Sequence, residues 1–174
     1  ITADGITALL PLRAYHPQFL DKAVNSLLSQ TSPDWELKII VERSDAGKFE
    51  DVLQHALQDS RIDLVINRGR KLAGAINSGM SAATTDFVAL LLGDDEWAPQ
   101  AIEVLKGAIQ RHPDSDFFHS SRRYIDETGA FISSEAAIVS LRWASPDETI
   151  PRARSNDLTS AREQSMRTKK HITL

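Results

Sequence analysis

Three acidic residues stand side by side in residues 88–99, VALLLGDDEWAP, where Asp94, Asp95 and Glu96 follow an apolar run. Carboxylates this close repel each other unless a cation or a hydrogen-bonding ligand offsets their charge. Their oxygens suit Mg²⁺ or Mn²⁺, and the chain has no cysteine that would select a softer ion. The alternative interpretation is an exposed acid pair that stabilises the amino terminus of a helix.

The elements that must position these acids follow from the hydrophobic pattern. Continuous apolar runs alternate with helix-type patterns, which predicts a mostly parallel sheet covered on both faces. We therefore expect an α/β fold, a Rossmann-like three-layer sandwich. The predicted strands are 6–10, 37–41, 62–66, 87–92 and 116–120, and the predicted helix faces lie within 20–28, 49–57, 72–80 and 102–109.

Ligands bind at the carboxyl ends of the strands in such sheets, so the residues after each strand form the candidate site. Acids beside cations fit a nucleoside diphosphate with a divalent metal: the metal and the cations bind the phosphates, and a carboxylate binds the base or the ribose. The Gly-rich motifs of Rossmann dehydrogenases and P-loop enzymes are absent from the sequence. The candidate residues, in chain order, are Pro11, Arg13, Glu42, Ser44, Arg70, Lys71, Asp94 and Asp95.

Composition limits the class of protein. A chain of 174 residues with 41% hydrophobic and 25% charged residues is typical of one soluble globular domain. No apolar run approaches the roughly 18 residues of a membrane span, and the net charge of −4 argues against a nucleic-acid partner. The absence of cysteine and of a signal-peptide pattern leads us to expect a cytoplasmic location. No pattern indicates an oligomeric state.

The last part of the chain, residues 151–174, is basic, with six cations against two acids. These residues have the character of a solvated tail or, if they have a function, of a lid over the ligand or a contact with an anionic acceptor or membrane. Between the two functions we favour the second, because six cations exceed what one diphosphate requires. This second function implies peripheral contact of the protein with the inner face of the membrane.

Three segments resemble the family 2 inverting glycosyltransferases with the GT-A fold. Residues 8–45, ALLPLRAYHPQFLDKAVNSLLSQTSPDWELKIIVERSD, resemble the opening of that family, with its S-L-x-x-Q-T helix end. Residues 67–99, NRGRKLAGAINSGMSAATTDFVALLLGDDEWAP, are similar to its N-x-G-x-x-x-A-x-N-x-G helix and D-x-D metal motif. Residues 114–131, DSDFFHSSRRYIDETGAF, resemble its next strand and I-D-x-x-G hairpin. The resemblance covers about residues 6–131.

The resemblance implies transfer of a sugar, with inversion, from a nucleotide-sugar donor to a hydroxyl of a surface glycan or lipid-linked acceptor. It implies a divalent cofactor, Mn²⁺ or Mg²⁺, on Asp94 and Asp95. It adds Asn77 to the donor-binding residues, with a bracing role toward the loops of Glu42 and Asp94. We interpret His119 as a structural histidine rather than a third metal ligand.

The sequence departs from the family pattern at three positions: Leu92 replaces the first acid of the metal motif, Arg43 an Asp or Gly, and Ile76 an Arg. The catalytic base is also unassigned. Inverting transfer needs a carboxylate beside the acceptor hydroxyl, and in the family this acid lies well beyond the metal motif. The candidates left in this chain are Asp126, Asp147 and Glu148.

We therefore keep a second hypothesis, a non-catalytic GT-A-like module that binds nucleotide-sugar or scaffolds a larger assembly. In either case we divide the chain into a nucleotide-sugar-binding domain, residues 1–134, and a basic acceptor-side segment, residues 135–174. This segment is either a shortened acceptor half or part of a longer protein.

Overall fold

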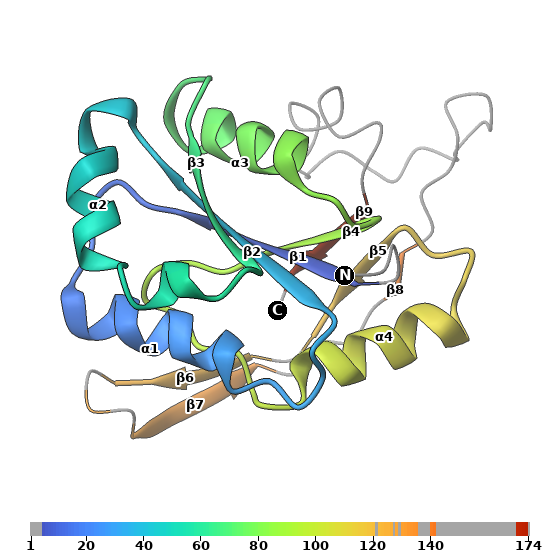
Figure 1. Ribbon diagram of the computed structural model, residues 1–174. Helices are drawn as coiled ribbons and strands as arrows, with labels where there is room; N and C mark the ends of the chain where they lie inside the picture. The colour runs from blue at the N-terminus through green and yellow to red at the C-terminus, as the bar shows by residue number, and fades with distance from the viewer. Residues whose placement is uncertain are drawn as a thin grey trace, which may run out of the picture.

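The computed structural model describes residues 5–120, 122–126, 128, 130–135, 140–141 and 170–173, and it shows the predicted α/β sandwich (Figure 1). Its main sheet has the strand order β3-β2-β1-β4-β9-β5-β8, in which only the β5–β8 pair is antiparallel. The strands of this sheet are β1 (Ile6–Pro11), β2 (Trp35–Val41), β3 (Ile62–Ile66), β4 (Phe87–Leu90), β5 (Phe117–His119), β8 (Ser140–Leu141) and β9 (Lys170–Thr173).

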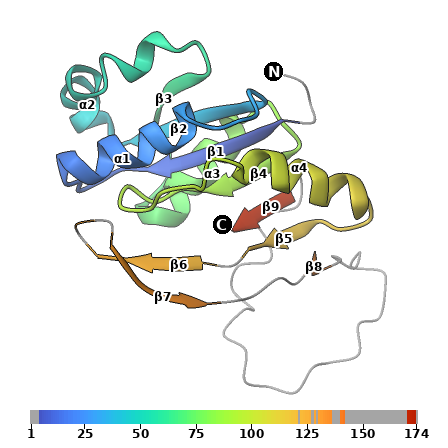
Figure 2. The same cartoon turned by 90° about the horizontal axis from the view of Figure 1, so that it is seen from below.

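Helices cover both faces of the sheet. Figures 1 and 2 show α3 on one face and α1 and α4 on the other, while a separate hairpin, β6–β7, lies below. None of the helices in the described part of the chain has the length and apolar character that a membrane crossing requires. The elements are α1 (Pro17–Leu28), α2 (Ala46–Val52), α3 (Lys71–Ala82), α4 (Ala101–Arg111), β6 (Arg122–Ile125) and β7 (Phe131–Glu135), with short 3₁₀ turns η1 (Arg43–Asp45) and η2 (Ala56–Gln58).

Side-chain alternation along the strands divides the core in two. Successive residues of a strand point to opposite faces of the sheet, so Leu10 of β1 packs in the cluster with α1 and α4, whereas Leu9 packs in the cluster with α3. The predicted apolar face of α1 is buried at Leu20, Val24 and Leu27, but the prediction is wrong at Leu28, which is 38% exposed. The predicted face of α4 is buried at Ile102 and Leu105.

The third predicted helix face is wrong at Leu72, whose side chain is 49% exposed. Helix α3 lies so close to the sheet that a Cβ at Gly79 would be 2.8 Å from Ile40 Cδ1 and 2.9 Å from Leu9 Cδ2. Such an approach selects small residues, so the buried face consists of Gly74, Ala75, Ser78, Gly79 and Met80. The prediction is thus confirmed at Ala75, Gly79 and Met80.

Residues on both sides of position 134 contribute to one sheet. Strand β9 pairs in parallel with β4 and with β5, and β8 pairs with β5. The division into residues 1–134 and 135–174 stays a prediction, but the described strands of the second segment belong to the same sheet as β1–β5.

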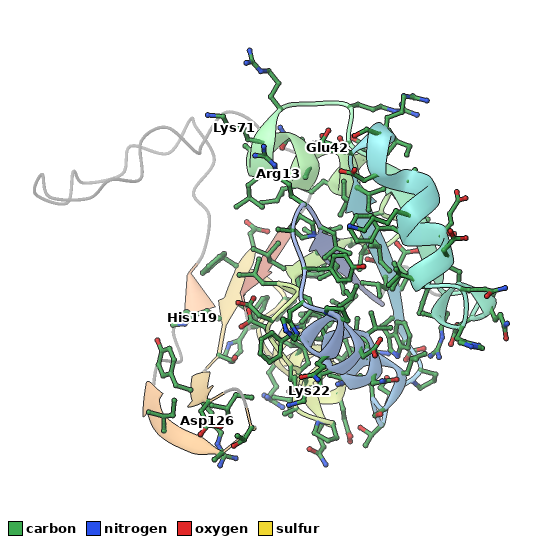
Figure 3. The ribbon with its side chains drawn as sticks, turned by 90° about the vertical axis from the view of Figure 1, so that its left-hand side faces the viewer. Arg13, Lys22, Glu42, Lys71, His119 and Asp126 are labelled. Atoms are coloured by element: carbon green, nitrogen blue, oxygen red, sulfur yellow. The ribbon has the colours of Figure 1, made fainter. Side chains whose placement is uncertain are left out.

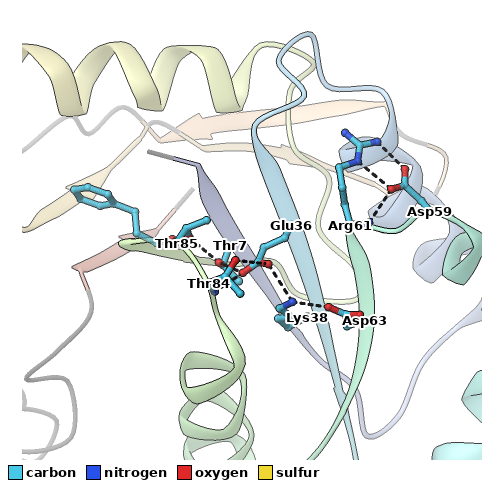
Figure 4. A network of polar contacts seen from close by, with 9 residues as sticks. Thr7, Glu36, Lys38, Asp59, Arg61, Asp63, Thr84 and Thr85 are labelled. Atoms are coloured by element: carbon cyan, nitrogen blue, oxygen red, sulfur yellow. Dashed lines mark hydrogen bonds and ion pairs between the residues drawn. The ribbon is translucent and has the colours of Figure 1, made fainter. Parts of the chain in front are cut away.

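A polar network is buried at the amino ends of β1 and β2 (Figure 4). Glu36 is 2% exposed, and its Oε1 accepts hydrogen bonds from the Thr7 hydroxyl at 2.6 Å and the Thr84 N–H at 2.7 Å. Its Oε2 accepts the Thr84 hydroxyl at 2.9 Å and lies 3.0 Å from Lys38 Nζ, which is also 2.5 Å from Asp63 Oδ2. Every charge in this network therefore has a partner, as burial requires.

The network shifts the pKa values of its two central groups. Burial raises the pKa of Glu36, but hydrogen bonds from Thr7, Thr84 and Lys38 outweigh burial and lower it below its ordinary value. Burial lowers the pKa of Lys38, yet its bonds to Asp63 and Glu36 raise it above its ordinary value. Both groups are thus more firmly charged in the folded protein than in the unfolded chain.

Candidate functional site

The carboxyl ends of β1, β2, β3 and β4 lie at one edge of the sheet because these strands are parallel neighbours. Glu42 directly follows β2 and is half-buried. Asn67, which follows β3, donates from Nδ2 to Glu42 Oε1 at 2.9 Å. Oε2 of Glu42 makes no hydrogen bond within the described residues, so this oxygen is available to a ligand.

Asn67 is itself held in place. Its Oδ1 accepts the Gly69 N–H at 2.8 Å and lies 3.4 Å from the Ser78 hydroxyl, which donates to the Gly74 carbonyl at 2.9 Å. Its own N–H donates to the Val41 carbonyl at 2.8 Å. The Gly69 N–H and the Ser78 hydroxyl thereby orient the Asn67 amide, and through it Glu42, while β2 holds the Asn67 backbone.

Asn67 is a residue that the sequence reasoning missed, because the bracing role toward Glu42 was assigned to Asn77. Asn77 is exposed on α3, where it borders a groove of about 590 Å³ between α3 and β3 together with Arg43 and Arg68. The sequence does contain a sign of this role. Asn67 is the Asn of the N-x-G motif, and an Asn side chain at that position commonly accepts the N–H of the residue two positions later in a turn.

The loop between β3 and α3 depends on a close contact between two glycines. A Cβ at Gly74 would lie 2.5 Å from the carbonyl carbon and 2.7 Å from the Cα of Gly69, and 3.3 Å from Asn67 Oδ1. Lys71, the first residue of α3, has a positive φ of 57°, which is uncommon for a residue with a side chain. The backbone is therefore folded back on itself just where α3 begins.

Gly74→Ala is expected to lower the free energy of unfolding by about 1–3 kcal/mol, because the new methyl group must push the loop backbone apart. Urea unfolding would measure the loss. Gly47→Ala is the matched control: a Cβ there meets nothing within 4 Å, and alanine is favoured over glycine in a helix such as α2. Equal stabilities of the two variants would show that the glycine contact does not constrain the loop.

Five cations lie in the loops at this edge of the sheet, and we call them the cationic rim. All five side chains are exposed, and none forms an ion pair with another described residue. Figure 3 shows Arg13, Glu42 and Lys71 at the same end of the molecule. Uncompensated cations here favour an anionic ligand. The cationic rim consists of Arg13, Arg43, Arg68, Arg70 and Lys71.

The acid pair follows β4 at the same edge. Asp94 and Asp95 are exposed, in a turn where the Asp95 N–H donates to the Leu92 carbonyl at 3.1 Å. The Asp94 carboxylate forms no hydrogen bond or ion pair within the described residues. Leu92, which stands in the position of the family's first acid, is 38% exposed.

The donor set at this turn fits a hard divalent ion only in part. In the described ranges no group of three or more His, Cys, Asp or Glu side chains could hold a metal ion. Mg²⁺ and Mn²⁺ do not need such a cage, since Mg²⁺ is commonly bound by one or two carboxylates together with waters and substrate phosphates. Asp94 and Asp95, beside the cationic rim, fit this mode of binding.

Two further candidate ligand-binding residues lie at the sheet edge, and the first candidate for the catalytic base lies in the hairpin. Pro11 is the half-buried last residue of β1, and Ser44 is exposed in η1. Asp126 lies in the β6–β7 turn, where Oδ1 accepts three hydrogen bonds, from the Thr128 N–H, the Thr128 hydroxyl and the Ala130 N–H. This carboxylate has a structural role in the turn, and Figure 3 shows it well away from Glu42.

Two further candidates for the base, Asp147 and Glu148, lie outside the described residues. His119, the last residue of β5, is partly exposed and faces Phe117 at a ring-centroid distance of 6.3 Å. In Figure 3 it lies nearer to Asp126 than to Glu42. The structure thus brings Glu42 and the cationic rim to one edge and leaves His119 and Asp126 apart from it.

Fold and site together define an α/β protein that presents acids and cations at the carboxyl ends of parallel strands. The chain belongs to glycosyl transferase family 2, whose family model matches residues 10–170. The family and the GT-A-type fold expected from the sequence are thereby confirmed. A solved structure, TarS from S. aureus, matches with a TM-score of 0.52 at 14% identity, over 71% of this chain and 23% of TarS.

Curated relatives carry glycosyltransferase names. The putative glycosyltransferase EpsE of Bacillus subtilis is 30% identical over 112 residues, which are 63% of this chain and 40% of EpsE. The UDP-Glc:alpha-D-GlcNAc-diphosphoundecaprenol beta-1,3-glucosyltransferase WfgD of Escherichia coli is 34% identical over 86 residues, 49% of this chain and 33% of WfgD. The chain thus spans between a third and two fifths of the length of these relatives.

Proposed function

We propose that this chain is the donor-binding part of a metal-dependent glycosyltransferase that moves a sugar, with inversion, from a nucleoside-diphosphate sugar to a hydroxyl of a surface glycan or glycolipid. The observation that carries the proposal is the grouping at one sheet edge of three features: a carboxylate fixed by Asn67, an exposed acid pair, and five cations that have no ion-pair partner among the described residues. Each of these features suits one part of a nucleotide-sugar. The carboxylate suits the nucleoside, the acid pair suits a metal bound to the diphosphate, and the cations suit the remaining phosphate charge.

The roles of the residues follow from their surroundings. Glu42 accepts hydrogen bonds from the nucleoside through its available Oε2. Asp94 and Asp95 would hold the divalent ion, which when bound neutralises charge on the departing diphosphate. The cationic rim stabilises the same developing charge. The names of two relatives, WfgD and the putative teichuronic acid biosynthesis glycosyltransferase TuaG of Bacillus subtilis, support a surface-glycan or lipid-linked acceptor.

The proposal extends to the location of the protein. We place it in the cytoplasm, at the inner face of the membrane, where the cations of residues 152–170 contact anionic lipid or a lipid-linked acceptor. Each cation near such a surface contributes roughly 1 kcal/mol to binding. Residues 152–169 of this segment lie outside the described part of the chain.

The test of the proposed function is a thermal-shift screen of nucleoside diphosphates and nucleotide-sugars, with and without Mn²⁺. Specific binding to the native state must raise the melting temperature. We expect at least one nucleoside diphosphate to raise it, and to raise it further with Mn²⁺. No shift with any of these compounds would refute the proposal.

The second hypothesis, a binding module without catalysis, is favoured by Leu92 at an acid position and by the structural role of Asp126. Slow Mn²⁺-dependent hydrolysis of the nucleotide-sugar found in the screen would establish the enzyme. Binding of the same compound without any turnover would establish the module.

Glu42→Gln is expected to weaken binding of the bare nucleoside diphosphate, even without metal, by about tenfold or more, because hydrogen bonds to a charged group are worth about 1.5–3 kcal/mol. Isothermal titration calorimetry would measure this change. Glu50→Gln, an exposed acid on α2, removes the same charge elsewhere and should leave the affinity unchanged. If both variants bind like the native protein, Glu42 is only a loop acid.

A further inference from the structure

The carboxyl end of α1 is hydrogen-bonded to the segment that follows the acid pair. Gln30 donates from Nε2 to the Ala98 carbonyl at 2.8 Å and accepts the Ile102 N–H on Oε1 at 3.0 Å. A second bond from Nε2, to the Ser26 carbonyl at 2.8 Å, holds the amide against the last turn of α1. One side chain thus joins α1, the segment after the acid pair and the first turn of α4.

Neighbours of Gln30 strengthen the same connection. The Trp97 N–H donates to the Ser26 hydroxyl at 3.1 Å, and the Thr31 N–H donates to the Pro99 carbonyl at 2.9 Å. The Thr31 hydroxyl lies 3.1 Å from Glu103 Oε2 of α4. We call Ser26, Gln30 and Thr31 the α1 brace.

The α1 brace also supplies a hydrogen-bond acceptor to the first turn of α4. The first N–H groups of a helix have no partner within the helix, and Gln100, at the N-cap of α4, forms no side-chain cap. Gln30, two residues beyond the end of α1, caps α4 through the Ile102 N–H. The start of α4 therefore depends on a residue that is remote in the sequence.

The acid pair lies between two fixed points. On one side the Leu91 N–H donates to the Leu9 carbonyl of β1 at 2.9 Å. On the other side Trp97 is 6% exposed in the core and bonded to the α1 brace. The Asp94 carboxylate has no hydrogen bond or ion pair within the described residues, so the backbone between these points sets its position.

We infer that Gln30 is a positioning residue for the carboxylates of Asp94 and Asp95, and that the α1 brace thereby sets the affinity of the site for a divalent ion. The inference rests on the proposed function for the identity of the ion. Loss of the Gln30 amide removes the acceptor of the Ile102 N–H and leaves the Ala98 carbonyl only its bond from the Ala101 N–H, so the loop and the first turn of α4 lose their common anchor on Gln30.

The variant that tests this inference is Gln30→Met, which keeps the length of the side chain and removes its hydrogen bonds. Two measurements are made on the whole chain: amide hydrogen exchange along the sequence, and titration with Mn²⁺ in the presence of UDP, followed by electron paramagnetic resonance of free Mn²⁺. We expect faster exchange confined to residues 92–103. Residues that orient metal ligands typically contribute 10- to 100-fold to metal affinity, so we expect Mn²⁺ binding weakened about tenfold or more.

Val24→Ala is the matched control, since Val24 is a buried residue of the same helix that contributes to the core. It should lower the melting temperature at least as much as Gln30→Met while leaving Mn²⁺ affinity and exchange of residues 92–103 near native values. Unchanged exchange in Gln30→Met, or equal loss of Mn²⁺ affinity in both variants, overturns the inference. If exchange rises as expected but the native protein binds no Mn²⁺ with UDP, the positioning of the loop is established and the metal-dependent function fails.

Discussion

Replacing Asp94 by Ala should abolish the metal-dependent part of nucleotide binding while changing the free energy of unfolding by no more than about 0.5 kcal/mol. The carboxylate is exposed and has no partner among the described residues, so little packing or hydrogen bonding is lost with it. A hard divalent ion held by only two carboxylates and the diphosphate cannot lose one of them and keep its affinity. Calorimetric titration of a nucleoside diphosphate, with and without Mn²⁺, would measure the effect.

Asp86→Ala provides the control for that experiment. Asp86 is an exposed acid directly before β4, whereas Asp94 follows β4, so the control removes the same charge at the other end of one strand. It should bind nucleotide with and without Mn²⁺ as the native protein does. Metal-dependent binding that survives in Asp94→Ala would mean that the ion is held elsewhere.

The largest loss of stability is expected from Glu36→Ala, at about 3–5 kcal/mol, the usual cost of removing one partner of a buried ion pair. Lys38, 5% exposed, would keep only Asp63, and the Thr7 hydroxyl and Thr84 N–H would lose their acceptor. Urea unfolding at neutral pH would measure the change. Glu50→Ala, which removes an exposed acid from α2, should stay within about 0.5 kcal/mol of the native protein.

The pH dependence of the free energy of unfolding tests the network of Glu36 and Lys38, because the direction of each pKa shift fixes the pH range in which the group stabilises the fold. Because the pKa of Glu36 is lowered on folding, its contribution is fully present above the ordinary glutamate value of 4.5 and is lost as the pH falls through the folded value. The pKa of Lys38 is raised, so its contribution is fully present below the ordinary lysine value of 10.5 and is lost as the pH rises through the higher folded value. Native protein and Glu36→Gln should therefore converge in stability at acid pH. Parallel curves down to low pH would contradict the assignment.

The regular elements were predictable because their signal is local. The predicted strand 62–66 is confirmed to the residue, and the others differ by one or two residues at their ends, such as β4, which ends at Leu90 before the turn at Gly93. The rim residues were predictable for a similar reason, since parallel strands place their carboxyl ends together whatever the loops contain.

The contacts that orient the site could not be predicted in the same way. Gln30 reaches a carbonyl 68 residues further along the chain, and Asn67 reaches a carboxylate 25 residues back. Neither separation leaves a periodic pattern in the sequence. Glu36 alternates with apolar residues in β2, a pattern typical of a strand with one face in water, yet here the polar face is buried with its partners. Tertiary hydrogen bonds, rather than local preference, decide these three positions.

The long reach of the α1 brace has a consequence for synthesis of the protein. Gln30 joins Ala98 and Ile102 across 68 and 72 residues, and Thr7 joins Thr85 across 78. Contacts of such sequence separation are slow to form, because a long loop must close before they contribute any stabilisation. On the ribosome, therefore, β1 and α1 emerge long before the residues that hold the acid pair in place. Until the residues up to Ile102 have been made, the nascent chain lacks the partners of Gln30, and until β4 has been made the edge of β1 that pairs with β4 stays open. Unpaired strand edges of this kind make partly folded chains prone to aggregation.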